Sequence, residues 1–459
     1  MSGWAAGAAA RPDEGRQRAG AAARPGDEPA SAGAAAWLAL AVLVIATIVG
    51  AVDRQLLVLM GEPLKQGLGL SDTQLGVLQG AGITLLAGLA AFPLGWLADR
   101  HDRRLILAAC VLLWSASTAA CGLARDFPEL LMAASGLGLG EAGLVPIVYS
   151  LIPDLFPRRQ RATANAVYAI AAVFGAGIGI WASALLLSGA EALARHLPGA
   201  LGGLEGWRVA FVLAASLGPL VALGIVLLKV RRHEKPDTAS TPEDASSDLM
   251  PYLRRHARAL GGIFGGMSAG SLGMSAVVTW LPVVAVRHFH VSVPEAGQAI
   301  GLGFAGGTLI GGVFAALQSR LRERHGVRAW ARGFAASVGL AGLCAAAMPA
   351  MTQLPALMLL FAVQVAATFA GSVIYANLIQ IATPARIRSR VLSMNAAGVA
   401  IVSAASPVIV GLLSDRLQVG TRPLLLAVAI TAVTALLLGA VAVWRAEAAI
   451  VRTVQDVGG

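Results

Sequence analysis

The sequence predicts an all-α membrane protein with twelve transmembrane helices arranged as two six-helix bundles. The chain of 459 residues is 57% hydrophobic and only 13% charged, with a mean hydropathy of +0.72. So little polar surface cannot cover a soluble protein of this size. Short basic turns separate long apolar runs, and one long polar break at 231–258 divides the runs into six and six.

Each apolar run is long enough to cross the membrane as a helix. At about 1.5 Å per residue, the runs span roughly 30 Å of hydrocarbon, some of them with tilt. Helices are required because a lone strand would leave its backbone groups unpaired in lipid. The expected spans are 37–60, 74–98, 104–124, 128–152, 161–187, 207–230, 259–286, 295–318, 327–349, 353–377, 389–413 and 421–444.

Segments outside the spans complete the expected organisation. Residues 1–36 are rich in Ala, Pro, Gly and Arg and have no hydrophobic pattern, which is typical of a disordered tail and not of a cleavable signal peptide. We expect five segments: the tail 1–36, an N-terminal bundle 37–230, a linker 231–258, a C-terminal bundle 259–444 and a second tail 445–459.

Basic residues are divided unevenly between the two sides of the membrane. With a cytoplasmic N-terminus and twelve spans, 27 of the 35 Lys and Arg residues lie on the cytoplasmic side. This asymmetry follows the positive-inside rule, and an odd error in the number of spans would have scrambled it. We therefore expect a multi-pass protein of the plasma (inner) membrane with both termini, the linker and both tails in the cytoplasm.

Composition and motifs argue against several other classes of protein. The net charge of +10 sits in short clusters between apolar runs, where anionic headgroups and topology explain it better than nucleic acid does. No Gly-x-x-x-x-Gly-Lys-Ser/Thr motif occurs, so an ATP-driven pump is not expected. All seven histidines lie in loops or at span ends, away from any intramembrane catalytic cluster. We therefore expect no enzyme, no cofactor and no metal.

The two halves carry a faint internal repeat. Pro157-Arg-Arg-Gln-Arg161-Ala enters the fifth span, and Pro384-Ala-Arg-Ile-Arg388-Ser enters the eleventh, which is the matching position of the second half. Parallel repeats of this kind place a substrate site between two bundles near the middle of the membrane. Chance similarity between two short basic turns is the alternative.

Three charged residues of the N-terminal half lie inside the spans and away from the first and last few residues. Asp53 and Arg54 are adjacent in the first span, and Glu141 lies more than ten residues from either end of the fourth. A carboxylate inside the membrane is energetically costly and is found there mainly when it has an ionic partner or a function. These residues are therefore candidates for proton coupling. Alternatively, Asp53 and Arg54 mark the approach to the outer interface, with the arginine snorkelling.

A short basic turn separates the second and third spans. Its pattern Gly-x-Leu-x-Asp-Arg-x-x-Arg-Arg is formed by Gly95, Asp99, Arg100, Arg103 and Arg104. This pattern resembles the loop signature of the major facilitator superfamily. We assign this turn to gating, because Asp99 can pair with Arg103 or Arg104 or cap the N-terminus of a neighbouring helix such as the eleventh span. A solvated turn residue is the alternative for Asp99.

Further short segments of the chain share the pattern of one known family. They are Val52–Arg54, Gly67–Gln79, the Asp99 loop, Gly138–Ala142, Pro153–Phe156 and Gly175–Gly179, with looser matches at Pro384–Arg386, Ser406–Pro407 and Gly411–Arg416. The first half thereby resembles the Spinster family of lipid transporters, and the most specific features are the Asp-Arg pair of the first span and Gly-Leu-Gly-Glu-Ala of the fourth. One departure is Ala134, where Spinster-like proteins usually carry an arginine seven residues before the glutamate.

The resemblance implies proton-coupled movement of lysolipid-like or sphingosine-phosphate-like amphiphiles. Asp53 and Glu141 are the candidate proton carriers, and protonation would remove an ion pair with Arg54. Without a cation on its own helix, Glu141 is expected to be protonated for much of the cycle unless Arg54 pairs with it. Arg54 alternatively binds an anionic headgroup.

Polar side chains within the spans supply candidate substrate contacts. We single out Gln79, Tyr168, Gln364 and Asn377, although interhelical hydrogen bonds explain such residues equally well. The second half has no charge in the middle of any span, which favours an amphipathic cargo over sugars or multiply charged anions. The expected partners are this small molecule, protons and the lipid bilayer, with the protein acting as a monomer.

Two rival functions remain open on the sequence alone. The first is a proton-coupled drug or organic-acid porter of the same superfamily. The second is a sensor built on a transporter scaffold, which would bind ligand without flux. Competition by lysolipids against small carboxylates separates the first rival from a lipid transporter.

Overall fold

The computed structural model is almost entirely helical and confirms the predicted fold class. It describes residues 33–196, 205–228, 246–323, 326–384, 386–417 and 422–458, and none of these residues forms a strand. Twelve helical segments in this part of the chain are long and apolar enough to cross a membrane. Residues 1–32 of the expected tail and 231–245 of the expected linker lie outside the described residues, and the rest of the linker holds a short helix, Ser246–Arg255, and the start of the next span.

Several spans of the first half are built from more than one helical element. A π-helical stretch interrupts the second span, and Gly143 divides the fourth two residues after Glu141. The elements of this half are α1 (Ala34–Leu59), α2 (Gly61–Leu68), α3 (Asp72–Val77), η1 (Leu78–Leu85), α4 (Leu86–Arg100), α5 (Arg103–Leu123), α6 (Phe127–Ala142), α7 (Leu144–Leu155), α8 (Arg158–Ala194), α9 (Gly206–Ala215) and α10 (Leu217–Val226).

The second half has longer, mostly unbroken helices. Its elements are α11 (Ser246–Arg255), α12 (Ala257–Phe289), α13 (Val293–Glu323), α14 (Gly326–Ala347), the 3-10 turn η3 (Met348–Ala350), α15 (Leu354–Ile381), α16 (Arg388–Arg416) and α17 (Pro423–Gly458).

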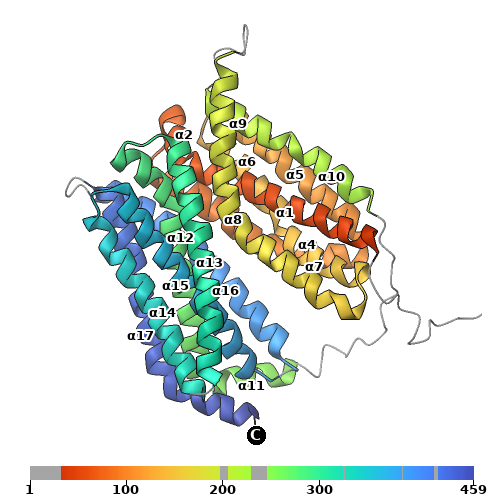
Figure 1. Cartoon of the computed structure of the whole chain (residues 1–459), viewed down its shortest axis with the longest axis vertical. Helices are drawn as coiled ribbons and strands as arrows, with labels where there is room; N and C mark the ends of the chain where they lie inside the picture. Colours follow the sequence, from red (N-terminus) through yellow and green to blue (C-terminus); the bar gives the residue numbers. More distant parts are fainter. Residues whose placement is uncertain are drawn as a thin grey trace, which may run out of the picture.

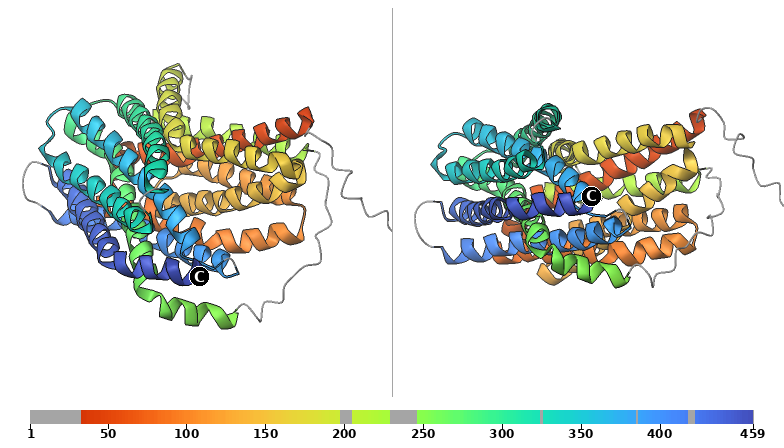
Figure 2. Two further views of the ribbon diagram at one scale, coloured as in Figure 1. Left: turned by 60° about the horizontal axis from the view of Figure 1, so that its bottom comes forward. Right: turned by 90° about the horizontal axis from the view of Figure 1, so that it is seen from below.

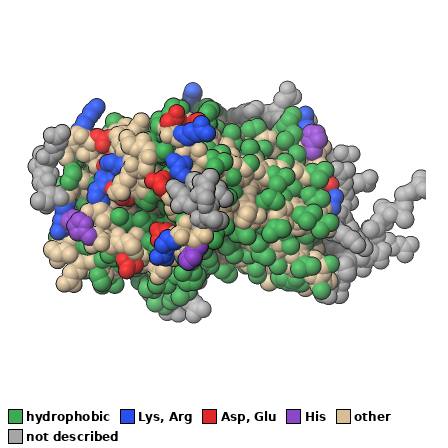
Figure 3. All heavy atoms as spheres, turned by 90° about the horizontal axis from the view of Figure 1, so that it is seen from above, with side chains coloured by type: hydrophobic (Ala, Val, Ile, Leu, Met, Phe, Trp, Pro, Cys, Tyr) green, Lys and Arg blue, Asp and Glu red, His purple; other side chains and the backbone are tan. Residues whose placement is uncertain are grey.

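The two halves form two bundles that lie side by side (Figure 1). They approach each other at the end that carries α2, which we call the α2 end, and diverge toward the end that carries α11, which we call the α11 end (Figures 1 and 2). On the face seen in Figure 3, hydrophobic side chains cover a band between two ends at which charged and histidine side chains gather. This distribution is the one expected of a chain whose middle faces lipid.

Glycines bring the two bundles into close contact along the antiparallel pair formed by α3–η1 and α16. A Cβ atom added at Gly76 would collide with the backbone of Pro407, and one at Gly80 with the carbonyl oxygen of Ala404. At the α2 end, Gly411 abuts the carbonyl oxygen of Asp72 in the same way. A second contact joins the bundles, where α8 packs on α13 through glycines of both helices. Small residues let helices in lipid approach this closely.

The internal repeat expected from the sequence has matching side-chain contacts in the two halves. Arg161 donates to the carbonyl oxygen of Phe156, five residues earlier, at 3.0 Å. Arg388 donates to the carbonyl oxygen of Thr383, also five residues earlier, at 3.0 Å. Each arginine therefore satisfies a carbonyl at the turn that precedes its span, as basic side chains do near helix C-termini.

The expected tail 445–459 continues the last helix, because α17 runs on to Gly458. Ala446 and Ile450 are buried and one turn apart, which gives this extension an apolar face. His256, between α11 and α12, hydrogen-bonds through Nδ1 with the hydroxyl of Thr453 at 3.0 Å. Burial lowers the pKa of His256, so its ring is neutral at pH 7.

Two adjacent glycines provide a test of the close packing within the second bundle. A Cβ atom at Gly307 would lie 2.5 Å from the carbonyl oxygen of Ala362, whereas one at Gly306 would meet nothing within 4 Å. We expect Gly307→Ala to lower the free energy of unfolding by about 1–3 kcal/mol through overpacking. Gly306→Ala should leave it unchanged or raise it by up to about 1 kcal/mol, because alanine favours helix. Thermal unfolding of the two purified variants in detergent measures both changes in stability. Equal unfolding midpoints for the two variants would contradict the close contact of Gly307 with Ala362.

Candidate functional site

A cavity of about 400 Å³ lies between the two bundles. Residues of α1, η1 and α8 line it from the first half, and residues of α12 to α17 from the second. The lining comprises Arg54, Gln55, Val58, Gln79, Ile83, Thr84, Ala176, Gly266, Met267, Gly270, Ser271, Met274, Ser275, Val278, Thr279, Phe304, Phe334, Val338, Thr368, Gly371, Ser372, Ser403 and Leu436. Its place at the interface of two repeats is where such folds hold their substrates.

One ion pair provides the charge of this site. The Nε atom of Arg54 lies 2.8 Å from Oε2 of Glu141, so the first and fourth spans are joined as the sequence allowed. The glutamate side chain is 10% exposed, while Arg54 is 38% exposed and lines the cavity. Arg54 is the one charged residue among the lining residues of this cavity. The pair therefore offers a cation to the cavity and keeps its carboxylate behind.

Asp53 is buried behind the cavity lining and has no ionic partner of its own in the described part of the chain. It is 1% exposed, and neither carboxylate oxygen has a hydrogen-bond partner among the described residues. The indole of Trp114 lies beside it without hydrogen-bond geometry, and the carboxyl interacts electrostatically with Glu141. An unpaired carboxylate is costly to bury, so this position suits a group that can hold a proton.

The π-helical stretch η1 shapes the wall of the cavity next to Arg54. Gln79, Ile83 and Thr84 all line the cavity from this stretch. The hydroxyl of Thr84 donates to the carbonyl oxygen of Gln79 at 2.9 Å, which satisfies a carbonyl in the widened turn. π-helical turns of this kind occur frequently at functional sites.

The second bundle contributes apolar side chains and hydroxyl groups. Met267, Met274, Phe304 and Phe334 provide flexible and aromatic apolar surface. Several of the hydroxyls are satisfied by backbone carbonyls, as in the 3.2 Å bond from Ser275 to Ser403. With one cation on one side and apolar surface on the other, the cavity can accept a molecule that has an anionic or polar head and an apolar body.

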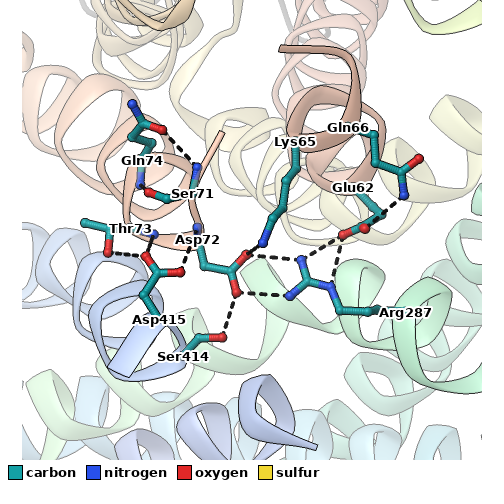
Figure 4. Close-up of polar contacts among 10 residues, drawn as sticks. All are labelled: Glu62, Lys65, Gln66, Ser71, Asp72, Thr73, Gln74, Arg287, Ser414 and Asp415. Atoms are coloured by element: carbon teal, nitrogen blue, oxygen red, sulfur yellow. Dashed lines mark hydrogen bonds and ion pairs between the residues drawn. The ribbon is translucent and has the colours of Figure 1, made fainter. Parts of the chain in front are cut away.

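At the α2 end, a network of charged residues joins the two bundles (Figure 4). Arg287 of α12 donates to Oε2 of Glu62 at 2.8 Å and pairs bidentately with Asp72 at 3.0 and 3.1 Å. Lys65 adds a 2.6 Å contact to Asp72, and Ser414 of α16 donates to the same carboxylate at 2.6 Å. Asp72 is 3% exposed, so the fork of Arg287 offsets the desolvation of a buried charge.

The same end also has a helix cap that crosses from one bundle to the other. Asp415 of α16 accepts hydrogen bonds from the backbone amides of Asp72 and Thr73 at 3.2 and 2.8 Å, and from the Thr73 hydroxyl at 2.6 Å (Figure 4). Ser71 and Gln74 complete the start of α3 with a capping box. These contacts close the α2 end of the interface between the bundles.

The four expected substrate contacts lie in different environments. Gln79 lines the cavity, whereas the other three do not belong to its lining residues. Tyr168 is fully buried in the first bundle, where its hydroxyl accepts a 3.2 Å bond from Thr47. Gln364 is also fully buried, and Asn377 donates to the carbonyl oxygen of Val373 at 3.0 Å.

The expected gating turn makes its described contacts within the first bundle. Arg103 pairs with Asp154 at 2.8 Å, and Arg104 pairs with Asp102 at 2.7 Å. Arg100 lies over the ring of Trp96, 3.8 Å from its centroid. Gly95 has open space where a side chain would be. The side chain of Asp99 lies outside the described part of the structure, so its expected pairing stays a prediction.

Reasoning from the sequence missed the residues of the α2 end. Glu62, Lys65 and Arg287 stand near span ends, where hydropathy classes them as interface residues. Asp72 and Asp415 were noted as parts of the Spinster resemblance without a role. A signal was present in Gly411–Arg416, whose pattern Gly-x-Leu-x-Asp-Arg repeats that of Gly95–Arg100.

Sequence comparisons relate the chain to a family of membrane proteins. The sequence profile of the Major Facilitator Superfamily matches residues 42–341. An MFS-type efflux pump of Mycolicibacterium smegmatis is 26% identical over 421 residues, covering 90% of this chain and 93% of the pump. The mouse sphingosine-1-phosphate transporter SPNS2 is 30% identical over 142 residues, 30% of this chain and 26% of that protein.

A solved structure has the same fold over nearly the whole chain. The crystal structure of a bacterial homologue of the human lysosomal transporter Spinster, in an inward-facing and unoccupied conformation, aligns with a TM-score of 0.73 at 22% identity. It covers 92% of this chain and 97% of the homologue.

Fold, cavity and spans define a multi-pass integral membrane protein of the secondary transporter class. The chain belongs to the Major Facilitator Superfamily. The prediction that it is a transporter and not an enzyme is therefore confirmed by its family.

Opening of the α2 end can be tested with a thiol reporter in the cavity. In a background with Cys110, Cys121 and Cys344 replaced by serine, Ser271→Cys places the reporter on the cavity wall. Arg287→Gln leaves two carboxylates facing each other and should raise labelling by an impermeant maleimide, added from the side of α2, by about tenfold or more.

The matched control is Arg422→Gln, because Arg422 donates only within the second bundle in its described contacts, to carbonyl oxygens of Pro349 and Met351. It should leave the labelling rate unchanged. An equal rate in the Arg287 and Arg422 variants would show that the charged network does not close this end.

Proposed function

We propose that this protein is a proton-coupled secondary transporter that moves an amphipathic, lipid-like small molecule by alternating access. The observation that carries the proposal is the Arg54–Glu141 ion pair at the wall of a cavity whose remaining lining is apolar or weakly polar. The excess of Lys and Arg residues on one side of the membrane supports cytoplasmic termini and an extracellular α2 end. The state described is then closed to the outside.

Proton coupling follows from competition for Arg54. While Glu141 is ionised, it is the partner of the arginine. An anionic headgroup that binds Arg54 displaces this carboxylate, which is then left buried with no cation and takes up a proton. Headgroup and proton binding therefore favour each other, and Asp53 is a second buried carboxyl close enough to Glu141 to sense its charge.

The chemistry of the cavity walls supports an amphipathic cargo. A single cation matches one anionic group, whereas sugars and dicarboxylates need several polar partners that the second bundle does not provide. The similarity to a sphingosine-1-phosphate transporter supports the same class, although it covers only 30% of this chain.

A drug or organic-acid porter is the second candidate. It is favoured by the similarity to an efflux pump, which extends over 90% of the chain. An apolar drug molecule would contact the Met and Phe side chains that line the cavity and would not need Arg54. Competition experiments in liposomes distinguish the two candidates.

The role of Glu141 can be tested by flux driven by a pH gradient. In liposomes that contain the purified protein, Glu141→Gln should reduce gradient-driven uptake of a labelled lysolipid by about tenfold or more, because an amide cannot exchange a proton. The matched control is Glu129→Gln, since Glu129 begins the same helix and is exposed. Uptake that is equal in the two variants would remove Glu141 from the coupling mechanism.

The pH dependence of binding tests the competition for Arg54. For the wild-type protein, affinity for a lysolipid with a phosphate headgroup should rise as the pH falls, because protonation of Glu141 frees the arginine. A coupling of about tenfold is typical of linked sites. In Glu141→Gln the affinity should be high and should change with pH only as the ligand itself titrates. A wild-type affinity that falls on acidification would contradict this linkage.

A further inference from the structure

Trp114 and Asp53 are two buried polar groups that lie beside each other without a hydrogen bond. Trp114 of α5 is fully buried, and Asp53 of α1 is 1% exposed. Neither the indole nitrogen nor either carboxylate oxygen has a hydrogen-bond partner among the described residues, although the two groups are close enough to interact. An unpartnered donor and an unpartnered acceptor are both costly to bury, so a small movement that joins them is favourable.

Glycines hold the indole between the two helices that carry the buried carboxyl groups. At Gly50, three residues before Asp53 on α1, an added Cβ atom would lie 3.8 Å from Cζ2 of Trp114. At Gly140, the residue before Glu141 on α6, it would lie 2.7 Å from Cβ of Trp114. The indole therefore fills the space between α1 and α6, and a displacement of these helices changes its distance from Asp53.

The other groups that face Asp53 cannot replace this donor. Glu141 of α6 is a carboxylate, and it engages Arg54 at 2.8 Å. Cys121 of α5 also interacts electrostatically with Asp53, but a thiol is a weak donor. The remaining helices packed on α1 contribute no charged side chain to the described interactions of Asp53. Trp114 is therefore the strong neutral donor beside this carboxyl group.

The chemistry of an indole suits the control of a neighbouring proton. Its N–H group can donate a hydrogen bond but cannot accept one, so the indole cannot take the proton of Asp53 itself. A hydrogen bond to an ionised carboxylate is stronger than one to a neutral carboxyl group. The ionised form of Asp53 is therefore stabilised when the indole approaches, whereas the protonated form is favoured when the indole withdraws.

We propose that Trp114 is a positioning residue for proton exchange at Asp53. In the state described, the two groups are not hydrogen-bonded and Asp53 holds its proton. In the opposite state, the helices bring the indole N–H to the carboxylate, and the proton leaves to water that enters from the cavity. When Asp53 takes up a proton again, the hydrogen bond weakens and the indole withdraws. This inference deepens the proposed proton coupling and rests on it.

Infrared spectroscopy can follow the protonated carboxyl group of Asp53 directly. For purified protein in lipid nanodiscs without substrate, the C=O band that disappears in Asp53→Asn belongs to this residue. Difference spectra at increasing pH give the midpoint at which the band is lost. Trp114→Phe should raise this midpoint by about one pH unit, which is tenfold in proton affinity, because the carboxylate then lacks a charge-assisted hydrogen bond.

The matched control is Trp280→Phe in the second bundle. Trp280 is 1% exposed, and its indole nitrogen also has no hydrogen-bond partner among the described residues. This substitution removes the same atoms from a buried indole but leaves the first bundle unchanged, so the midpoint should stay at the wild-type value. A purely structural role of Trp114 would lower the stability of the protein without moving the midpoint.

A second variant keeps the test available if Trp114→Phe does not fold. Trp114→benzothienylalanine, introduced by codon suppression, places a sulfur atom where the indole has its N–H group and keeps nearly the same shape. It should raise the midpoint as Trp114→Phe does, while the contacts with Gly50 and Gly140 are retained.

Midpoints in the Trp114 variants equal to that of Trp280→Phe would overturn this inference. A band of Asp53 that does not change over the pH range in which the protein is folded would overturn it as well. These spectra need neither cargo nor a pH gradient. A wrong cargo would therefore appear in the flux assays and leave the spectra as predicted, whereas a wrong role for Trp114 would leave the effect of Glu141→Gln on flux intact.

Discussion

A charge inside a bilayer must find its partner within the protein, and this constraint decides the architecture of the site. Arg54 and Glu141 come from the first and fourth spans and meet at 2.8 Å beside the cavity between the bundles. Because lipid offers no counter-ion, the pair holds two helices together and also presents a cation to the cavity. Under the proposed function, an anionic headgroup competes with Glu141 for Arg54, which links the binding of ligand to the state of one carboxyl group.

The second constraint acts at the ends of the bundles. At the α2 end, Arg287, Asp72 and Asp415 connect elements of both halves through charged hydrogen bonds. Asp72 is buried and depends on Arg287 as the partner of its charge, whereas the contacts of Asp415 with Thr73 are exposed and compete with water, which makes them individually modest. A closure of this kind suits a transporter, since it must be stable enough to seal one side and weak enough to open within each cycle.

The sequence predicted most of the fold and part of the site, for physical reasons that can be stated. The sequence predicts the twelve spans and the two halves because the thickness of the bilayer sets the length of an apolar run. It predicts Asp53, Arg54 and Glu141 as site residues because a charged side chain inside the bilayer is costly. Tyr168 illustrates what hydropathy could not resolve, since the faces toward lipid and toward the bundle are both apolar. That residue was expected near the substrate but is buried beside Thr47. Contacts such as Asp72 with Arg287 join residues 215 positions apart, and no local pattern pairs them.

The central claim, that a proton moves with the exchange of partners at Arg54, is tested most directly by following protons themselves. Liposomes containing the wild-type protein and a trapped pH dye, with no initial pH gradient, receive a lysolipid with a phosphate headgroup. The account predicts a change in lumenal pH that begins with lysolipid movement and is absent in liposomes without protein. Measured lysolipid flux with no accompanying pH change would contradict it.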